Sequence, residues 1–168
     1  DSGFDLDGMS VTYTPYDNVD QYRACSLVIS ELPTNPNEGT VINLSDDDFE
    51  TLNPVVVWLY GVEYSSFHLS SNGRITFTSG DPDYTESLNE HFEQPGISML
   101  WDDLNPANGG TIRYATFMNR VAVTFNDVPE YSNTGSNTFQ CELFYDGRIR
   151  LSWLGVDSND NIVGLSAG

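Results

Sequence analysis

The sequence predicts an all-β protein, an antiparallel β-sandwich that is jelly-roll-like. Three observations support this fold class. Apolar and polar residues alternate with a period of two along most of the 168-residue chain, which is the pattern of half-buried strands. Turn signals recur at intervals of roughly 8–15 residues, as expected for a sandwich of about ten strands. The only stretch with a helical pattern is short, residues 84–92.

The individual strands follow from runs of β-branched and aromatic residues that end at Gly, Asn or Asp. In chain order they are residues 11–14, 26–30, 40–44, 55–59, 66–69, 74–78, 111–116, 120–125, 138–145, 148–153 and 162–166. Asp146-Gly147 is a strong hairpin signal. In the hairpin it joins, alternation places apolar residues inward and a polar stripe outward, where we expect a solvated face: Gln140, Glu142, Arg148, Arg150 and Ser152.

The chain length fits one domain over residues 1–168, with an N-terminal ribbon over about 1–50 and a core over about 55–168. The abrupt first and last residues suggest a domain excised from a larger secreted protein. Two cysteines are present, Cys25 and Cys141. Their spacing matches no zinc motif, and it leaves open whether they form a disulfide or whether Cys141 is a buried free thiol.

The charge is strongly one-sided, with 25 acidic residues, six arginines, no lysine and a net charge of −19. This balance argues against binding to nucleic acid or to an anionic membrane surface, because both are polyanions. No signal peptide is visible, and the longest apolar run, residues 55–60, is too short to span a membrane. The composition favours a secreted protein in salty or calcium-containing surroundings, where bound cations relieve the self-repulsion. General solubility and salt tolerance explain the charge equally well.

One stretch singles itself out as a candidate metal site. The apolar run Met99-Leu100-Trp101 ends in Asp102 and Asp103, and Asn105 follows. Calcium prefers hard oxygen ligands from loops, so Asp102, Asp103 and Asn105 form one candidate ligand set; the alternative is a strand end whose Asp side chains accept bonds from the turn. Further candidate ligands are Asp5 and Asp7, and the run Asp46-Asp47-Asp48 is either a solvated loop or part of a calcium site.

Aromatic residues supply a second kind of candidate site. Tyr84, Trp101 and Tyr131 lie near polar or acidic residues, including Asn105 and Glu130. Exposed rings beside carboxylates and amides suit a carbohydrate, since a sugar offers an apolar C–H face and hydroxyl groups; the alternative is that the rings pin loops to the sandwich. The sequence has no nucleophile elbow, HExxH, CxxC or phosphate loop, so we expect no enzyme activity and no catalytic residues.

Six segments in the same order carry a family resemblance: FHLSSNGRITF (67–77), ISMLWDDLNP (97–106), GGTIRYA (109–115), RVAVTFNDVPEY (120–131), NTFQCELFYDGRIRLSW (137–153) and IVGLSAG (162–168). Over about residues 55–168 the chain resembles the NIDO-like, nidogen-type β-sandwich domains of matrix proteins and of secreted bacterial modular proteins. The resemblance implies a non-catalytic extracellular accessory domain, without naming a ligand.

These observations predict a secreted or cell-surface binding module, appended to a larger enzyme or surface protein, with structural Ca²⁺ as its cofactor. The predicted partner is an extracellular polysaccharide that is neutral or weakly charged, because the surface is acidic. Two alternatives stay open: a protein-binding adhesion module for a matrix or surface protein, and a calcium-stabilised structural spacer.

Overall fold

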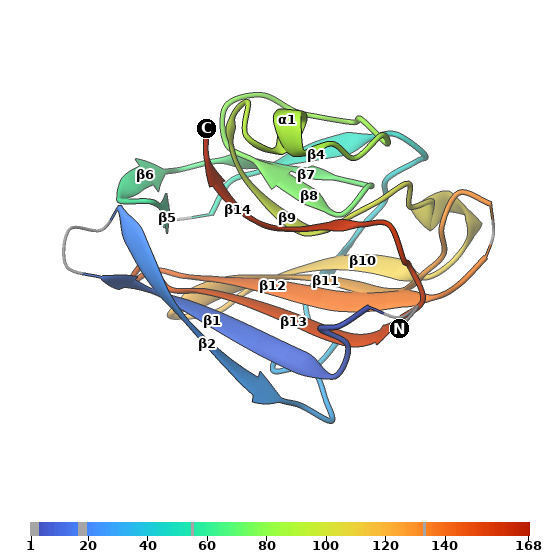
Figure 1. The fold of residues 1–168 in the computed structure, drawn as a ribbon, viewed down its shortest axis with the longest axis horizontal. Coiled ribbons are helices and arrows are strands. Elements are labelled where there is room, and N and C mark those ends of the chain that lie inside the picture. The colour runs from blue at the N-terminus through green and yellow to red at the C-terminus, as the bar shows by residue number, and fades with distance from the viewer. Residues whose placement is uncertain (1–3, 17–19, 55, 133) are drawn as a thin grey trace.

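Two antiparallel sheets stack face to face in the computed structural model, which describes residues 4–16, 20–54, 56–132 and 134–168 (Figure 1). The larger sheet has the strand order β2 (Gln21–Val28), β1 (Met9–Tyr16), β13 (Ile149–Val156), β12 (Asn137–Phe144), β11 (Arg120–Val128), β10 (Thr111–Thr116) and β3 (Thr40–Ile42). The smaller sheet has the order β14 (Ile162–Ala167), β9 (Pro95–Trp101), β8 (Arg74–Thr76), β7 (Phe67–Ser70) and β4 (Phe49–Leu52).

Three smaller elements complete the architecture. They are the hairpin of β5 (Val57–Leu59) and β6 (Val62–Tyr64), the helix α1 (Leu88–His91) and the 3₁₀ turn η1 (Pro106–Asn108). The helix is one turn long and begins at the N-cap Ser87, whose hydroxyl accepts from the Glu90 N–H and donates to the Glu90 carboxylate. Val55, where the sequence predicts a strand to begin, lies outside the described residues.

The antiparallel sandwich predicted from the sequence is confirmed, and its strand order refines the jelly-roll-like description. The consecutive strands β10 to β13 are neighbours in one sheet, so they form a meander, whereas a jelly roll is built from Greek keys. The turn between β12 and β13 falls at Asp146-Gly147 as predicted. There the Gly147 N–H donates to the Phe144 carbonyl, and Gly147 has a φ of 89°.

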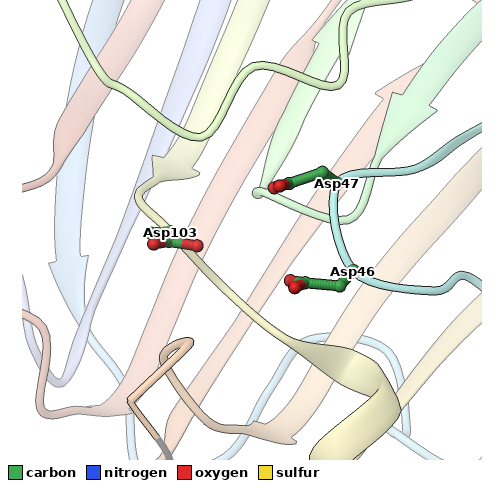
Figure 2. Close-up of side chains that lie close together, drawn as sticks. All are labelled: Asp46, Asp47 and Asp103. Atoms are coloured by element: carbon green, nitrogen blue, oxygen red, sulfur yellow. The ribbon is translucent and has the colours of Figure 1, made fainter.

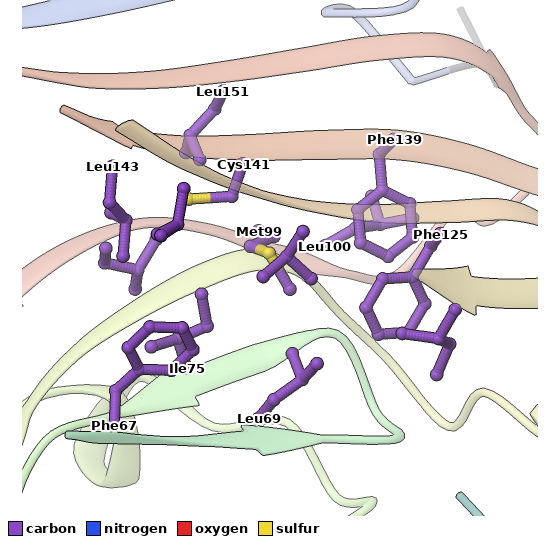
Figure 3. Close-up of a cluster of buried hydrophobic side chains, with 14 of the residues drawn as sticks. Phe67, Leu69, Ile75, Met99, Leu100, Phe125, Phe139, Cys141, Leu143 and Leu151 are labelled. Atoms are coloured by element: carbon purple, nitrogen blue, oxygen red, sulfur yellow. The ribbon is translucent and has the colours of Figure 1, made fainter. Parts of the chain in front are cut away.

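The core lies between the two sheets and takes residues from both (Figure 3). Phe125 and Phe139 stack with ring centroids 4.6 Å apart, and the indole of Trp153 donates to the Met99 carbonyl at 2.7 Å, which ties β13 to β9 in the other sheet. Cys141 is fully buried, and its burial raises the pKa of the thiol. Cys25 is exposed on β2, and both cysteines are free thiols, so the disulfide alternative is not realised.

The expectation of a solvated outer face on β12 and β13 is wrong for Gln140, Glu142 and Ser152, which are buried. Residues 31–38, which we call the outer segment, lie over this face. Its Thr34 exchanges backbone hydrogen bonds with the Gln140 side chain at 2.9 Å and donates its hydroxyl to Glu142 at 2.7 Å. Glu142 also accepts from Arg120 at 2.8 Å and pairs with Arg150. The middle of the stripe is polar because Gln140 and Glu142 belong to a buried hydrogen-bonded network, which binary patterning reads as solvent exposure. The side chain of Arg148, at the end of the stripe, is exposed as predicted.

Candidate metal and ligand site

Three carboxylates converge at one end of the sandwich. Asp46 and Asp47 lie in the loop between β3 and β4, and Asp103 follows β9. Each offers a carboxylate oxygen, and these oxygens all lie within 4.8 Å of one another. Figure 2 shows Asp46 and Asp47 pointing from their loop toward the segment that carries Asp103. We call this set the acidic cluster.

The loop before β4 divides its three aspartates between two roles. Asp48 closes its own turn, since its carboxylate accepts from the Ser45 N–H at 3.2 Å and from the Phe49 N–H at 2.9 Å. Asp47 has a left-handed backbone with φ of 47°, a conformation that Asp tolerates better than most residues. This geometry leaves Asp46 and Asp47 to face Asp103, so the sequence run is partly a turn and partly a cluster.

Asp102 and Asp103 point in different directions, as neighbours at a strand end should. Asp102 is buried and accepts from the Ser158 hydroxyl at 2.5 Å and from the Asp103 N–H at 2.7 Å. It therefore has the role of the strand-end alternative, while Asp103 joins the acidic cluster. The predicted metal set of Asp102, Asp103 and Asn105 is thus split: Asn105 caps η1 by accepting from the Ala107 N–H at 3.1 Å.

The acidic cluster is electrostatically uncompensated. Burial and then the charges of Asp47, Asp46 and Asp102 raise the pKa of Asp103 from 3.8 to about 6. Burial, and then Asp47, also raise the pKa of Asp46. The Oδ1 atom of Asp46 is buried, and among the described residues it has no hydrogen-bond partner. Such a site gains free energy by taking up a proton or a cation.

Two tyrosines flank the acidic cluster. Together with Asp46, Asp47 and Asp103 they line a pocket of about 300 Å³, and Tyr84 is 51% exposed and Tyr131 57% exposed. The Tyr131 N–H donates to the Asp103 carbonyl at 2.7 Å, and this bond fixes the backbone of Tyr131 beside the acidic cluster. The sequence predicts Asp103 as a metal ligand and the two tyrosines as part of a separate ligand site, and the structure places all three around one pocket.

The pocket continues into two further hollows. On the Tyr84 side, Asp47 and Tyr84 also line a shallow depression with Asp81, Pro82 and Asp83. On the opposite side, Asp103 and Tyr131 also line a depression of about 150 Å³ with Asp102, Glu130 and Ser132. Glu130, predicted as a ligand-binding residue, therefore borders the same continuous surface. We call the three hollows together the end groove.

Asn72, in the tight turn between β7 and β8, holds the loops of the end groove together. Its fully buried side chain donates to the Asp47 carboxylate at 3.0 Å and to the Pro82 carbonyl at 3.1 Å, and it accepts from the Leu104 N–H at 3.1 Å. One amide thus connects the loop of Asp47, the loop leading to Tyr84 and the segment after Asp103. A polar residue in a tight turn gives no sequence signal for such long-range contacts.

Trp101 does not belong to the exposed surface, and its prediction as a ligand-binding ring is corrected. Its side chain is fully buried, and its indole N–H donates to the Asp83 carbonyl at 3.1 Å. Arg74, also buried, lies over the ring at 4.2 Å and pairs with Asp81. Trp101 and Arg74 anchor the loop that carries Tyr84, which is the alternative role of pinning a loop to the sandwich.

Asp5 and Asp7 lie away from the acidic cluster. They occupy a turn before β1 and not a strand, so the alternate spacing does not put them on one face. Asp7 accepts a hydrogen bond from the Gly155 N–H, and Asp5 is exposed. Within the described ranges, the three-carboxylate group includes neither residue. The Asp7 N–H closes this turn by donating to the Phe4 carbonyl at 3.2 Å.

The fold and the end loops define a β-sandwich domain that carries its polar site on loops at one end. Residues 30–167 match the family model described as NIDO related, so the chain belongs to the NIDO-related family and is a domain of extracellular type. The match begins earlier than residue 55 and excludes both β1 and β2. A search of curated proteins and a search of solved structures each found no match. Among the described residues, no helix is long and apolar enough to cross a membrane.

Proposed function

We propose that this domain is a non-catalytic binding module of a secreted or surface-attached protein, and that it holds a neutral carbohydrate chain in the end groove with the help of Ca²⁺. The observation that carries the proposal is the placement of two half-exposed tyrosines around three converging carboxylates. Neither feature alone has this meaning. Together they place a candidate cation site and two apolar ring surfaces in the lining of the same pocket.

The acidic cluster fits calcium chemistry. Calcium takes about six to eight oxygen ligands at roughly 2.3–2.6 Å, so ligand oxygens bound to one ion lie within about 5 Å of each other. The separation of 4.8 Å or less among the oxygens of Asp46, Asp47 and Asp103 meets this limit. Three carboxylates leave coordination positions open, and water or the hydroxyl groups of a sugar would fill them.

The tyrosines and the neighbouring hollows fit a chain of sugars. An exposed ring packs on the apolar C–H face of a pyranose, while hydroxyl groups bond to carboxylates such as Glu130. Because the hollows on either side share Tyr84 and Tyr131 with the central pocket, an extended ligand has room on both sides of the cation. The net charge of −19 favours a neutral polysaccharide over a sulfated one.

Retention on immobilised neutral polysaccharides, with calcium or with excess chelator, tests the proposal. We expect the wild type to be retained only with calcium, and Tyr84→Ala and Tyr131→Ala to lose retention while keeping their melting temperature. Phe92→Ala is the matched control, because Phe92 is an aromatic residue with the same 57% exposure as Tyr131 but lies outside the pocket lining.

Other outcomes would replace the proposal. Calcium-dependent melting without retention on any glycan would point to the calcium-stabilised spacer. Retention on immobilised matrix proteins instead of glycans would point to the adhesion module. Retention that does not change with chelator or with either tyrosine variant would exclude the end groove as the binding site.

A further inference from the structure

The outer edge of the larger sheet is an exposed strand. β2 pairs on one side with β1, and among the described strands none pairs with its other side. Nearly every residue of β2 is exposed, including Leu27 at 53% and Val28 at 79%. Figure 1 shows β2 at the margin of the larger sheet. An unpaired strand presents a row of free N–H and C=O groups.

This edge lacks the features that usually prevent strand pairing. The sequence of β2, QYRACSLV, contains no proline, lysine or carboxylate in a chain with 25 acidic residues. Its single charge, Arg23, folds back over the ring of Tyr16 at 3.7 Å. Its register with β1 is continuous over all eight residues, without a bulge. Edges that are long, regular and free of repelling charge favour pairing with another strand.

The hydrogen bonds of the sheet fix which groups of β2 face outward. The Ile29 N–H donates to the Gly8 carbonyl at 2.8 Å, in the same register as the Thr12–Cys25 pair. Bonding alternates along an antiparallel strand, so odd-numbered residues of β2 bond to β1. Tyr22, Ala24, Ser26 and Val28 therefore direct their backbone groups to the free edge.

We propose that β2 pairs antiparallel with β2 of a second copy of this chain, about a two-fold axis that passes at Cys25. With this axis, Ala24 lies opposite Ser26 of the second copy and Tyr22 lies opposite Val28 of the second copy, as hydrogen-bonded pairs. Cys25 then lies opposite Cys25 of the second copy, as a non-hydrogen-bonded pair, which is the closer of the two pair types. The two larger sheets become one continuous sheet across the dimer.

The side chains of β2 complement themselves in this register. The exposed Val28 gains the ring of Tyr22 from the second copy, and Leu27 gains the aliphatic part of Arg23. A C₂ contact requires such self-complementarity, because one patch must serve on both copies. The absence of carboxylates from β2 lets two chains approach there despite a net charge of −19 each, and added salt should strengthen the contact.

Sedimentation equilibrium over a range of concentrations tests for the dimer. We expect a reversible monomer–dimer equilibrium for the wild type and for Cys25→Ser, and a monomer for Ser26→Pro. Proline at position 26 removes an outward N–H and leaves the bonds to β1 intact. Val28→Asp is a second variant that should also be monomeric, because it puts a carboxylate on the paired edge of each copy. The variant should still fold, because Val28 is 79% exposed.

Amide hydrogen exchange adds a readout specific to strand pairing. In the dimer, Tyr22, Ala24, Ser26 and Val28 should exchange at least tenfold more slowly than in the monomeric variant Val28→Asp, where position 28 is left out of the comparison. The odd-numbered residues Arg23, Cys25 and Leu27 should be protected in both, because they bond to β1. Equal exchange of the even-numbered amides in both proteins would overturn the proposal.

Cross-linking tests the register. With oxidised glutathione as the disulfide reagent, a Cys25 thiolate forms a mixed disulfide and releases one glutathione; attack by the second copy's Cys25 thiolate then releases the other. We expect a covalent dimer of the wild type. The variant Cys25→Ser/Ala24→Cys should cross-link at least tenfold more slowly, because position 24 faces position 26. Equal cross-linking, or a wild type that is monomeric at every concentration, would overturn the proposal; in the monomeric case an unrelated strand would be the remaining partner for this edge.

Discussion

The molecule gathers charged residues in two places and balances them in opposite ways. Beneath the outer segment, Glu142 is fully buried, yet it accepts hydrogen bonds from Arg150, Thr34 and Arg120. Burial alone would raise the pKa of Glu142, but these bonds and the charge of Arg150 lower it below its ordinary value. In the acidic cluster, burial and neighbouring carboxylates raise the pKa of Asp103 instead.

The difference shows which carboxylates lack a compensating positive charge within the chain. Each of its six arginines has contacts elsewhere: Arg23 with Tyr16, Arg74 with Asp81, Arg113 with Gly39, Arg120 and Arg150 with Glu142, and Arg148 with Asp146. The buried network is complete within the protein and stabilises the fold. The acidic cluster is incomplete, and a ligand from outside is what would complete it.

The largest expected effect is the loss of Glu142. We expect Glu142→Ala to lower the free energy of unfolding by about 3 kcal/mol, because it leaves two arginines beneath the outer segment without their carboxylate. Urea denaturation measures this. Arg148→Gln is the control, since the Arg148–Asp146 pair is exposed, and its loss should change stability by less than about 0.5 kcal/mol. Similar values for both variants would contradict the contrast between a buried and an exposed ion pair.

Asn72 connects the acidic cluster to the rest of the fold, so its removal should affect both stability and binding. We expect Asn72→Ala to cost about 2 kcal/mol, because it leaves buried backbone groups unpaired. Residues that orient metal ligands typically contribute roughly 10- to 100-fold to metal affinity, and we expect that loss in calcium titration calorimetry. Asn119→Ala, at an exposed hairpin position, should change neither quantity. Unchanged calcium affinity in Asn72→Ala would show that Asp47 needs no support from Asn72.

Neutralising one member of the acidic cluster should stabilise the calcium-free protein. With excess chelator, we expect Asp103→Asn to melt roughly 2–4 °C higher than the wild type, which corresponds to about 1 kcal/mol for a domain of this size. The same variant should lose the rise in melting temperature that calcium gives the wild type. Asp146→Asn, whose carboxylate already pairs with Arg148, should show neither change. A calcium response that survives in Asp103→Asn would place the cation elsewhere.

The smallest effect is on the pH dependence of stability, where the two regions should act in opposite directions. The folded pKa of Asp103 is raised from 3.8 to about 6, so its repulsion is relieved, and the calcium-free protein gains stability, as pH falls from 7 toward 5. The folded pKa of Glu142 is lowered, so its contribution is complete above its ordinary value of about 4.5 and is lost as pH falls below that value. Urea denaturation midpoints, measured in chelator over this pH range, test both effects. The gain of stability between pH 7 and 5 should be absent in Asp103→Asn, and the loss below about pH 4.5 should be absent in Glu142→Gln.

Strand alternation and turn chemistry predicted most of the fold. Residues 111–116 were predicted as a strand with the bounds that the structure has, and the Asp146-Gly147 hairpin is confirmed. β4, with the sequence FETL, was missed because it is short and lies next to the acidic run. The outer stripe was misread because a polar residue under a covering segment has the same pattern as a solvated one.

The sequence points to some residues of the candidate site and not to others, depending on whether a local pattern or a long-range contact puts each residue there. Tyr84, Tyr131 and Asp103 stand out as aromatic or acidic residues in loops, and local sequence is enough to find them. Asp46 and Asp47 reach Asp103 only because β4 and β9 belong to one sheet, a relation that no local pattern contains. Trp101 was misassigned because the sequence does not show that Arg74 covers its ring.

The pairing of β1 with β13 has a consequence for the order in which the chain assembles. Met9 lies opposite Trp153, so the strand made first waits for one of the last strands before the larger sheet is complete. At a synthesis rate of about 5–20 residues per second, that wait is roughly 7–30 s. During this interval the newborn hairpin of β1 and β2 has two open edges instead of one, and the exposed apolar residues of β2 are free to meet another nascent chain. For this domain, the speed of translation and the crowding of ribosomes on one message therefore bear on correct folding, in addition to the stability of the finished sandwich.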